Sequence, residues 1–197
     1  MRGGRQAILK AAIEVFARKG YAGASTREIC REAGVTKPVL YYHFRGKEQL
    51  YRELMIDAFG NYRKLLQSAA QTRGGLRERL VRMVQTDFRW TRCDPLRMMF
   101  VLRMVFSPGD QLPFFDVVAE MEKDRDVIAN VLLEGQDARG LRKSARELAT
   151  ALIGMQLIAT LEYLFTRRPT LTRRRAERCV DLLLQGGVAR QKSCRSV

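Results

Sequence analysis

Hydrophobic residues recur at intervals of three and four along most of the chain, a spacing that places them on one face of an α-helix. The first such run extends from Arg5 to Arg18 and ends at Gly20. No stretch shows the sustained alternation of hydrophobic and polar residues that predicts a β-strand. The pattern therefore predicts an all-α protein of about nine helices.

Longer helices are expected after the first 46 residues, separated by turns rich in glycine, proline and polar residues. The clearest break is Thr72 to Gly75, which holds two glycines and no hydrophobic residue. A frayed tail is expected from Gln191 to Val197. The longer helices are predicted at Lys47 to about Ala70, Leu76 to about Phe88, Pro95 to Phe106, Pro113 to Leu133, Lys143 to Thr166 and Thr172 to Val188.

Two short helices joined by a tight turn are predicted between Ser25 and Lys47. Gly34 can adopt the left-handed backbone conformation that ends the first of them. Ser25 or Thr26 can cap the first helix, while Thr36 can cap the second.

Hydrophobic edges on both sides of Gly34 can bury a shared seam, which is the arrangement of a helix-turn-helix. The predicted edges are Ile29, Cys30 and Ala33 before the glycine, and Val35, Val39 and Leu40 after it. The first helix of the chain would cover this seam.

The second short helix, Lys37 to Phe44, carries basic and aromatic side chains that can reach phosphates and base edges. These segments resemble the signature of the TetR/AcrR family of bacterial transcriptional regulators over about the first 55 residues. Cys30 departs from the alanine that is more frequent there, and both residues are small. The matching segments are Gly20-Tyr21, Thr26 to Ile29, Ala33 to Val35, Leu40 to Phe44 and Lys47 to Leu50.

The resemblance implies an N-terminal three-helix DNA-binding head at residues 1–50, a larger helical ligand-binding and dimerisation body at residues 51–190, and a flexible tail at 191–197. Residues near base edges or the adjacent backbone would be Thr36, Lys37, Pro38, Val39 and Tyr41. Residues holding phosphates would be Thr26, Arg27, Tyr42, His43 and Lys47. A plainer interpretation makes the aromatic residues ordinary members of a small helical hairpin.

Charge and composition support a polyanionic partner. The chain has 36 Lys and Arg against 21 Asp and Glu, a formal net charge of +15, which favours binding to nucleic acid. The arginine clusters Arg167-Arg168 and Arg173 to Arg175 are interpreted as solvated helix ends, not as a second DNA site.

Catalytic and metal chemistry find little support in the sequence. The single histidine, His43, excludes most zinc and Ser-His-Asp arrangements, so no enzyme activity, metal or cofactor is expected. The four cysteines form no C-x-x-C pair, which fits a reducing, cytoplasmic environment. The most apolar stretch, Ala149 to Phe165, contains Gln156 and Glu162, which disfavours a membrane span.

The middle of the chain is rich in methionine and aromatic residues, which suggests an adaptable cavity for an apolar or amphipathic ligand. Asp87 falls on a hydrophobic helix face, where a carboxylate must be paired or functional. Its possible partners are Arg103, Gln156, Glu162 and Tyr163, and a salt bridge with an arginine is the plainer alternative. Candidate ligand contacts are Met83, Asp87, Trp90, Met99, Arg103, Phe114, Met121, Met155 and Glu162.

The last two helices carry more hydrophobic surface than one layer needs. They can close the core or, as the resemblance implies, form a four-helix bundle with a second copy. The sequence thus predicts a dimeric, ligand-responsive repressor of a palindromic operator. The alternative is a helical small-molecule or lipid-binding protein without regulatory output.

Overall fold

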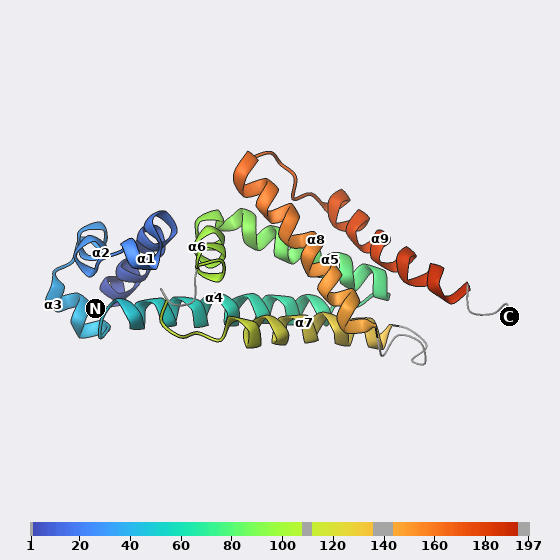
Figure 1. The fold of residues 1–197 in the computed structure, drawn as a ribbon, viewed down its shortest axis with the longest axis horizontal. Coiled ribbons are helices and arrows are strands. Elements are labelled where there is room, and N and C mark those ends of the chain that lie inside the picture. The colour runs from blue at the N-terminus through green and yellow to red at the C-terminus, as the bar shows by residue number, and fades with distance from the viewer. Residues whose placement is uncertain (1, 108–111, 136–143, 193–197) are drawn as a thin grey trace. The chain divides into compact units, whose positions relative to one another are not determined.

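The computed structural model describes residues 2–107, 112–135 and 144–192, which form nine α-helices and no strand (Figure 1). The all-α prediction is therefore confirmed for the described part of the chain. The helices are α1 (Arg2–Gly23), α2 (Thr26–Ala33), α3 (Lys37–His43), α4 (Lys47–Ala70), α5 (Leu76–Cys93), α6 (Pro95–Val105), α7 (Val117–Glu134), α8 (Ala145–Thr166) and α9 (Arg173–Lys192).

Several helix boundaries differ from the prediction, among them α1, which begins at Arg2 instead of Arg5, and α5, which ends at Cys93 instead of about Phe88. The first helix continues past Gly20, which takes φ 73° and kinks it, to Gly23. α7 begins at Val117 instead of Pro113, and the Phe115 ring packs 5.8 Å from that of Phe59. α9 extends to Lys192, so the start of the expected tail is helical. Residues 193–197 and Gly140 lie outside the described residues.

Packing divides the chain into two compact units. The first unit comprises residues 1–61 and 94–117, and the second comprises residues 62–93 and 118–197. α6 thus packs in the first unit, and α4 contributes residues to both. The proposed boundary at residue 50 concerns function and stays a prediction.

The core of the first unit forms where α1 packs against α2, α3 and α6. Ile8, Phe16, Ile29, Leu40 and Phe100 are fully buried there. The 22 residues of α1 thus cover both short helices, as the sequence predicts. Burying a side chain of this size contributes about 1.5–3 kcal/mol.

The core of the second unit joins α5, α8 and α9 with α7 and the end of α4. Leu80, Phe88, Ile128, Leu152 and Val180 are buried in it. α8 and α9 lie side by side and are linked by an ion pair between Glu162 and Arg175 at 2.6 Å (Figure 1).

Substituting two glycines separates backbone strain from helix propensity. Gly34 takes φ 64° at the end of α2, whereas Gly60 lies within α4, and no other atom lies within 4 Å of a Cβ added at either position. Gly34→Ala should therefore lower the free energy of unfolding by about 1–2 kcal/mol. Gly60→Ala should raise it by about 0.5–1 kcal/mol.

Urea unfolding followed by circular dichroism measures both effects. Equal stability of the wild type and Gly34→Ala would contradict the left-handed turn, while Gly60→Ala controls for the gain that an added methyl group gives elsewhere in a helix.

Candidate functional site

A left-handed turn at Gly34 joins α2 and α3. The Gly34 N–H donates to the Arg31 carbonyl at 3.3 Å, and the Val35 N–H donates to the Cys30 carbonyl at 3.0 Å. Both bonds satisfy carbonyl groups that the end of α2 leaves free. Cys30 is 5% exposed and Leu40 is fully buried. The predicted helix-turn-helix is therefore present in the structure.

The opposite face of α3 points to solvent. Lys37 and Pro38 are exposed, and the exposed fractions of Tyr41 and Tyr42 are 53% and 75%. Arg27 is also exposed, while Thr26 is half-buried at the start of α2. The structure thus places most of the predicted DNA contacts on accessible surface of the same unit.

Two predicted roles on α3 need correction. Thr36 occupies the N-cap position, but its side chain makes no capping hydrogen bond. Its hydroxyl is therefore available to another partner. Val39 is 38% exposed, so it lies at the edge of the seam, and Leu40 is the buried residue of this helix.

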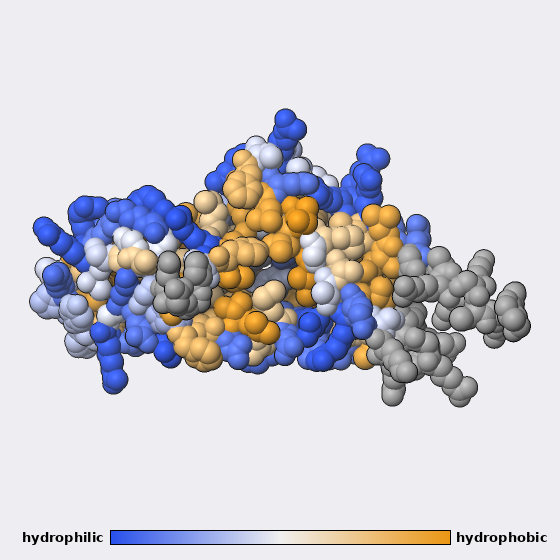
Figure 2. All heavy atoms as spheres, viewed as in Figure 1, coloured by the Kyte–Doolittle hydropathy of each residue, from blue (hydrophilic) through white to orange (hydrophobic). Residues whose placement is uncertain are grey.

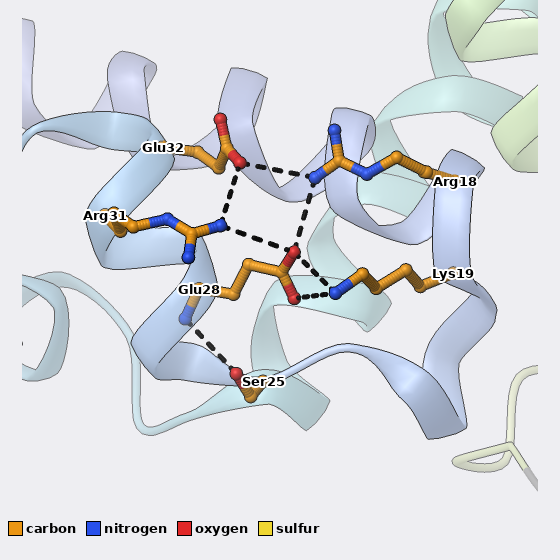
Figure 3. A network of polar contacts seen from close by, with 6 residues as sticks. All are labelled: Arg18, Lys19, Ser25, Glu28, Arg31 and Glu32. Atoms are coloured by element: carbon orange, nitrogen blue, oxygen red, sulfur yellow. Dashed lines mark hydrogen bonds and ion pairs between the residues drawn. The ribbon is translucent and has the colours of Figure 1, made fainter.

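Ion pairs fix α2 against α1 (Figure 3). The Glu28 carboxylate accepts hydrogen bonds from Lys19 at 2.9 Å and from Arg18 at 3.3 Å. The hydrogen bond from Lys19 lowers the pKa of Glu28. Ser25 caps α2 by accepting from the Glu28 N–H at 3.2 Å, as predicted. Such exposed pairs contribute little energy individually, but together they restrict how α2 can rotate on α1.

The Lys47 ammonium group links α4 to the corner between α1 and α2. It donates to the Tyr21 carbonyl at 2.9 Å and the Ala24 carbonyl at 3.0 Å. It also lies 4.2 Å from the centroid of the Tyr21 ring, and burial lowers its pKa. Two of its three N–H donors are therefore used internally. The predicted phosphate contact of Lys47, through the third donor, stays a prediction.

The beginning of α1 supports the end of α3. Arg5 forms an ion pair with Glu53, and its guanidinium lies 5.3 Å from the centroid of the Phe44 ring. His43 is half-buried and forms an edge contact with the Tyr42 ring. A Cβ built on Gly4 would lie 3.7 Å from the Nε2 atom of His43. His43 therefore lies at the border between the exposed face and the support.

Asp87 of α5 lies in the interior of the second unit and is 8% exposed. Its partner is the Tyr62 side chain, instead of the four predicted residues or an arginine. Burial raises the pKa of Asp87 to about 6, and the hydrogen bond with Tyr62 acts in the opposite direction. Its Oδ2 atom has no partner among the described residues.

Four further buried polar atoms of the second unit lack a partner among the described residues. They are the Thr91 hydroxyl, the Nε2 atom of Gln156, the Nε atom of Arg125 and the Thr170 hydroxyl. Thr91 follows Asp87 by four residues and shares its helix face, while Gln156 lies on α8, which packs against α5. The sequence could have identified Thr91 through its spacing of four residues from Asp87. Nothing in the sequence pointed to Tyr62 as a partner of Asp87.

The nine predicted ligand contacts do not form one cluster within either unit. Met99, Arg103 and Phe114 belong to the first unit, and the other six belong to the second. Met83 is fully buried in the core, while Trp90 and Met155 are half-buried. Met121 and Phe114 are exposed.

Arg103 and Glu162 have structural partners. Arg103 donates to the carbonyls of Ala17 and Arg18 at 3.2 and 2.9 Å, where α1 reaches its kink. It therefore caps carbonyl groups that the kink leaves free. Glu162 is exposed and binds Arg175, and this hydrogen bond lowers the pKa of Glu162. These contacts give both residues structural roles, and their assignments to a ligand site stay predictions.

Comparison with known proteins agrees with this geometry. Residues 8–54 match the model of a family described as bacterial regulatory proteins, tetR family. Residues 8–54 are therefore similar to the DNA-binding segment of the tetR family. The chain is 27% identical over 169 residues to the uncharacterized HTH-type transcriptional regulator YdgC of Bacillus subtilis, covering 82% of each protein.

Two further proteins that are similar to this chain are transcriptional regulators. The chain is 28% identical over 167 residues to the HTH-type transcriptional activator FasR of Mycolicibacterium smegmatis, covering 84% of this chain and 74% of FasR. The transcriptional regulator FadR of Bacillus subtilis, solved in complex with stearoyl-CoA, shares the fold with a TM-score of 0.76 at 17% identity. That similarity covers 92% of this chain and 98% of FadR.

The raised pKa of Asp87 predicts a specific pH dependence of stability. An aspartate in an unfolded chain titrates near 3.9, and the folded chain holds this proton up to about pH 6. The folded state binds more protons in that window, so stability falls as pH rises through it. Relative to Asp87→Asn, the wild type should lose up to about 3 kcal/mol between pH 4 and pH 6.5.

Urea unfolding of both proteins across this range measures the difference. Asp124, whose pKa burial also raises to about 6, titrates in both proteins and cancels. A difference that stays constant with pH would contradict the buried position of Asp87.

Proposed function

We propose that this chain is a repressor that binds a palindromic operator as a homodimer and releases it when a small apolar or amphipathic effector binds the second unit. The observation that carries the proposal is the division of α3 into a buried edge at Leu40 and an exposed basic and aromatic face. This face has no role in the core of the chain. As a transcriptional regulator that acts on DNA, the protein would work in the cytoplasm.

The exposed face of α3 has the chemistry to read a duplex. The major groove of B-DNA admits an α-helix, and lysine can donate to guanine acceptors there. Lys37 lies in the first turn of α3, and Tyr41 follows it by four residues on the same face. Thr36 and Pro38 add a free hydroxyl and an apolar edge that can meet a thymine methyl group. Tyr42, Arg27 and Thr26 would position the unit through phosphates.

Dimerisation is supported by the surface of α8. The helix Ala145–Thr166 is long and apolar enough to cross a membrane by length and composition alone. Only 28% of its most apolar stretch is buried within the chain, so much of this apolar surface stays uncovered. Ile158 and Phe165 are 55% and 84% exposed, and Leu182 of α9 is 63% exposed. Hydrophobic residues gather on the face of the second unit around α8 (Figure 2). Covering this surface with a second copy would form a four-helix bundle.

A two-fold dimer has consequences for the operator. Two copies of α3 about 34–36 Å apart would enter successive major grooves, so the operator would be palindromic. A seven-residue α3 contacts few bases, and a second copy doubles the specific contacts.

The effector would bind where the second unit leaves polar groups unpaired. Asp87, Thr91 and Gln156 each bury an atom without a partner among the described residues, and a ligand could pair with them at no further desolvation cost to the protein. The solved complex of FadR with stearoyl-CoA supports a small amphipathic molecule as the class. An effector that binds better to a dimer with wrongly spaced α3 helices would lower operator affinity.

Two lysine substitutions should affect DNA binding differently. Lys37→Ala should change which sequences are preferred, because its contact is to base edges. Lys47→Ala should weaken binding to every duplex alike, because it loosens the corner that holds α2 and loses one charge near phosphates. Lys64→Ala, which removes an exposed lysine of the second unit, should leave both properties unchanged.

Selection from a random duplex library, followed by gel shifts of selected and scrambled duplexes, measures both effects. The assignment fails if neither substitution changes affinity or preference. A reporter gene placed behind the selected operator then separates a repressor, which lowers expression, from an activator.

The proposed dimer can be tested with a matched pair of substitutions that each introduce a charge. Ile158→Arg should convert the protein to a monomer, because an arginine there would be buried without a partner between two copies of α8. Ile56→Arg changes a similarly exposed isoleucine of α4 in the first unit, at 62% exposure, and should leave the dimer intact. Sedimentation velocity distinguishes the two. A wild-type monomer at micromolar concentration would contradict the proposed assembly.

A further inference from the structure

The second unit contains an open cavity of about 450 Å³ that none of the predicted ligand contacts line. Its walls come from the end of α4, one face of α5, and the segment that leads into α9. A volume of this size is typical of small-molecule sites. The lining residues are Leu65, Ser68, Ala69, Thr72, Arg82, Gln85, Thr86, Phe88, Arg89, Arg92, Leu171, Thr172 and Arg173.

The lining is cationic on one part and apolar on another. Four of its residues are arginines and none is acidic. Leu65 is half-buried and contributes apolar surface, while Phe88 and Leu171 lie almost fully buried behind it. Ser68, Thr72 and Thr172 add hydroxyl groups. This combination suits a molecule with an anionic group at one end and a hydrocarbon part at the other.

Three of the arginines are oriented by contacts of their own. Arg92 donates to the Leu171 carbonyl and so ties the segment before α9 to α5. Arg82 binds Glu78 at 2.8 Å, and Arg173 binds Glu177 at 2.9 Å, each within its own helix. A guanidinium has five N–H donors, so these contacts fix the side chains and leave donors for a ligand.

Arg89 carries a charge that no acidic residue compensates among the described residues. It is exposed, lies one turn from Arg92 and Gln85 on α5, and lines the cavity. A cation on the wall of a concave site attracts anions more strongly than the same cation on an open surface.

The start of α9 adds to this positive potential. α9 begins at Arg173, has no acidic residue in its first turn, and its preceding residue Thr172 caps the Arg175 N–H at 3.2 Å. Thr172 and Arg173 both line the cavity. The positive end of the α9 dipole and its free N–H groups therefore lie at the same wall as the arginines.

We infer that this cavity binds a phosphate-bearing amphiphile, with the phosphate group held by Arg89, Arg173 and the start of α9, and the hydrocarbon part against Leu65. Arginine favours phosphate because it can donate two parallel hydrogen bonds to it. A duplex is a poorer occupant, since its phosphates would have to enter a concave site with an apolar floor. The inference concerns a site separate from Asp87 and does not depend on DNA binding.

Isothermal titration of the full-length protein with decyl phosphate, decanoate, decanol and inorganic phosphate, all below micelle-forming concentrations, tests the inference. Decyl phosphate should bind one molecule per chain, at least tenfold more tightly than decanol and inorganic phosphate. Decanoate should be intermediate, because it has one charge and two acceptor atoms. Binding should weaken as salt is raised.

Variants locate the site. Arg89→Gln combined with Arg173→Gln should weaken decyl phosphate binding at least tenfold, and Ser68→Trp should block it by occupying space without changing charge. Arg73→Gln removes an exposed arginine of the same unit that does not line the cavity, and should change affinity less than twofold. Thermal melting confirms that each variant is folded.

Three results would overturn the inference: no heat with 1 mM decyl phosphate, equal affinity for decanol, or unchanged affinity in both cavity variants. Gel shifts of the same protein samples report operator binding independently, so failure of the cavity site and failure of the proposed regulator are distinguishable.

Discussion

The burial of Leu40 is the contact on which the function of the first unit depends. α3 has seven residues, too few for a helix to be stable in water by itself. It exists as a helix because Leu40 packs into the core that α1 and α2 build around Ile29 and Phe16. The same contact determines that Lys37 and Tyr41 point outward. The exposed face is thus a consequence of what the buried edge requires.

Polar side chains hold the helices around Leu40 in place, and several of them bind backbone carbonyls at helix ends. Lys47 holds the carbonyls between α1 and α2, and Arg103 holds those at the kink of α1. The Glu28 network adds a third link between α1 and α2. Helix ends leave carbonyls without partners, so a small unit of short helices has many such groups to satisfy. Long basic side chains from α4 and α6 satisfy several of them, which accounts for part of the positive charge of the chain.

The second unit is built differently, and its interior is not fully satisfied. Its helices are longer and bury a larger apolar core, yet Asp87, Thr91 and Gln156 keep buried atoms without partners among the described residues. Each such atom lowers the free energy of unfolding, so the second unit is less stable than it would be with these atoms paired. Its arginine-lined cavity lies on another face of α5. α5 therefore carries buried polar side chains on one face and the arginines of the open cavity on another.

The sequence by itself determined the helices, the turn at Gly34 and the exposed residues of α3, because these follow from local spacing, capping and the left-handed preference of glycine. It did not determine the partners of Asp87, Arg103 and Glu162, because long side chains can reach several groups and only the packing of distant helices selects one. Tyr62 is 25 residues from Asp87, and Arg103 is 85 residues from Arg18. The cavity was equally hidden, since its lining comes from three separate segments that are brought together only in the folded unit.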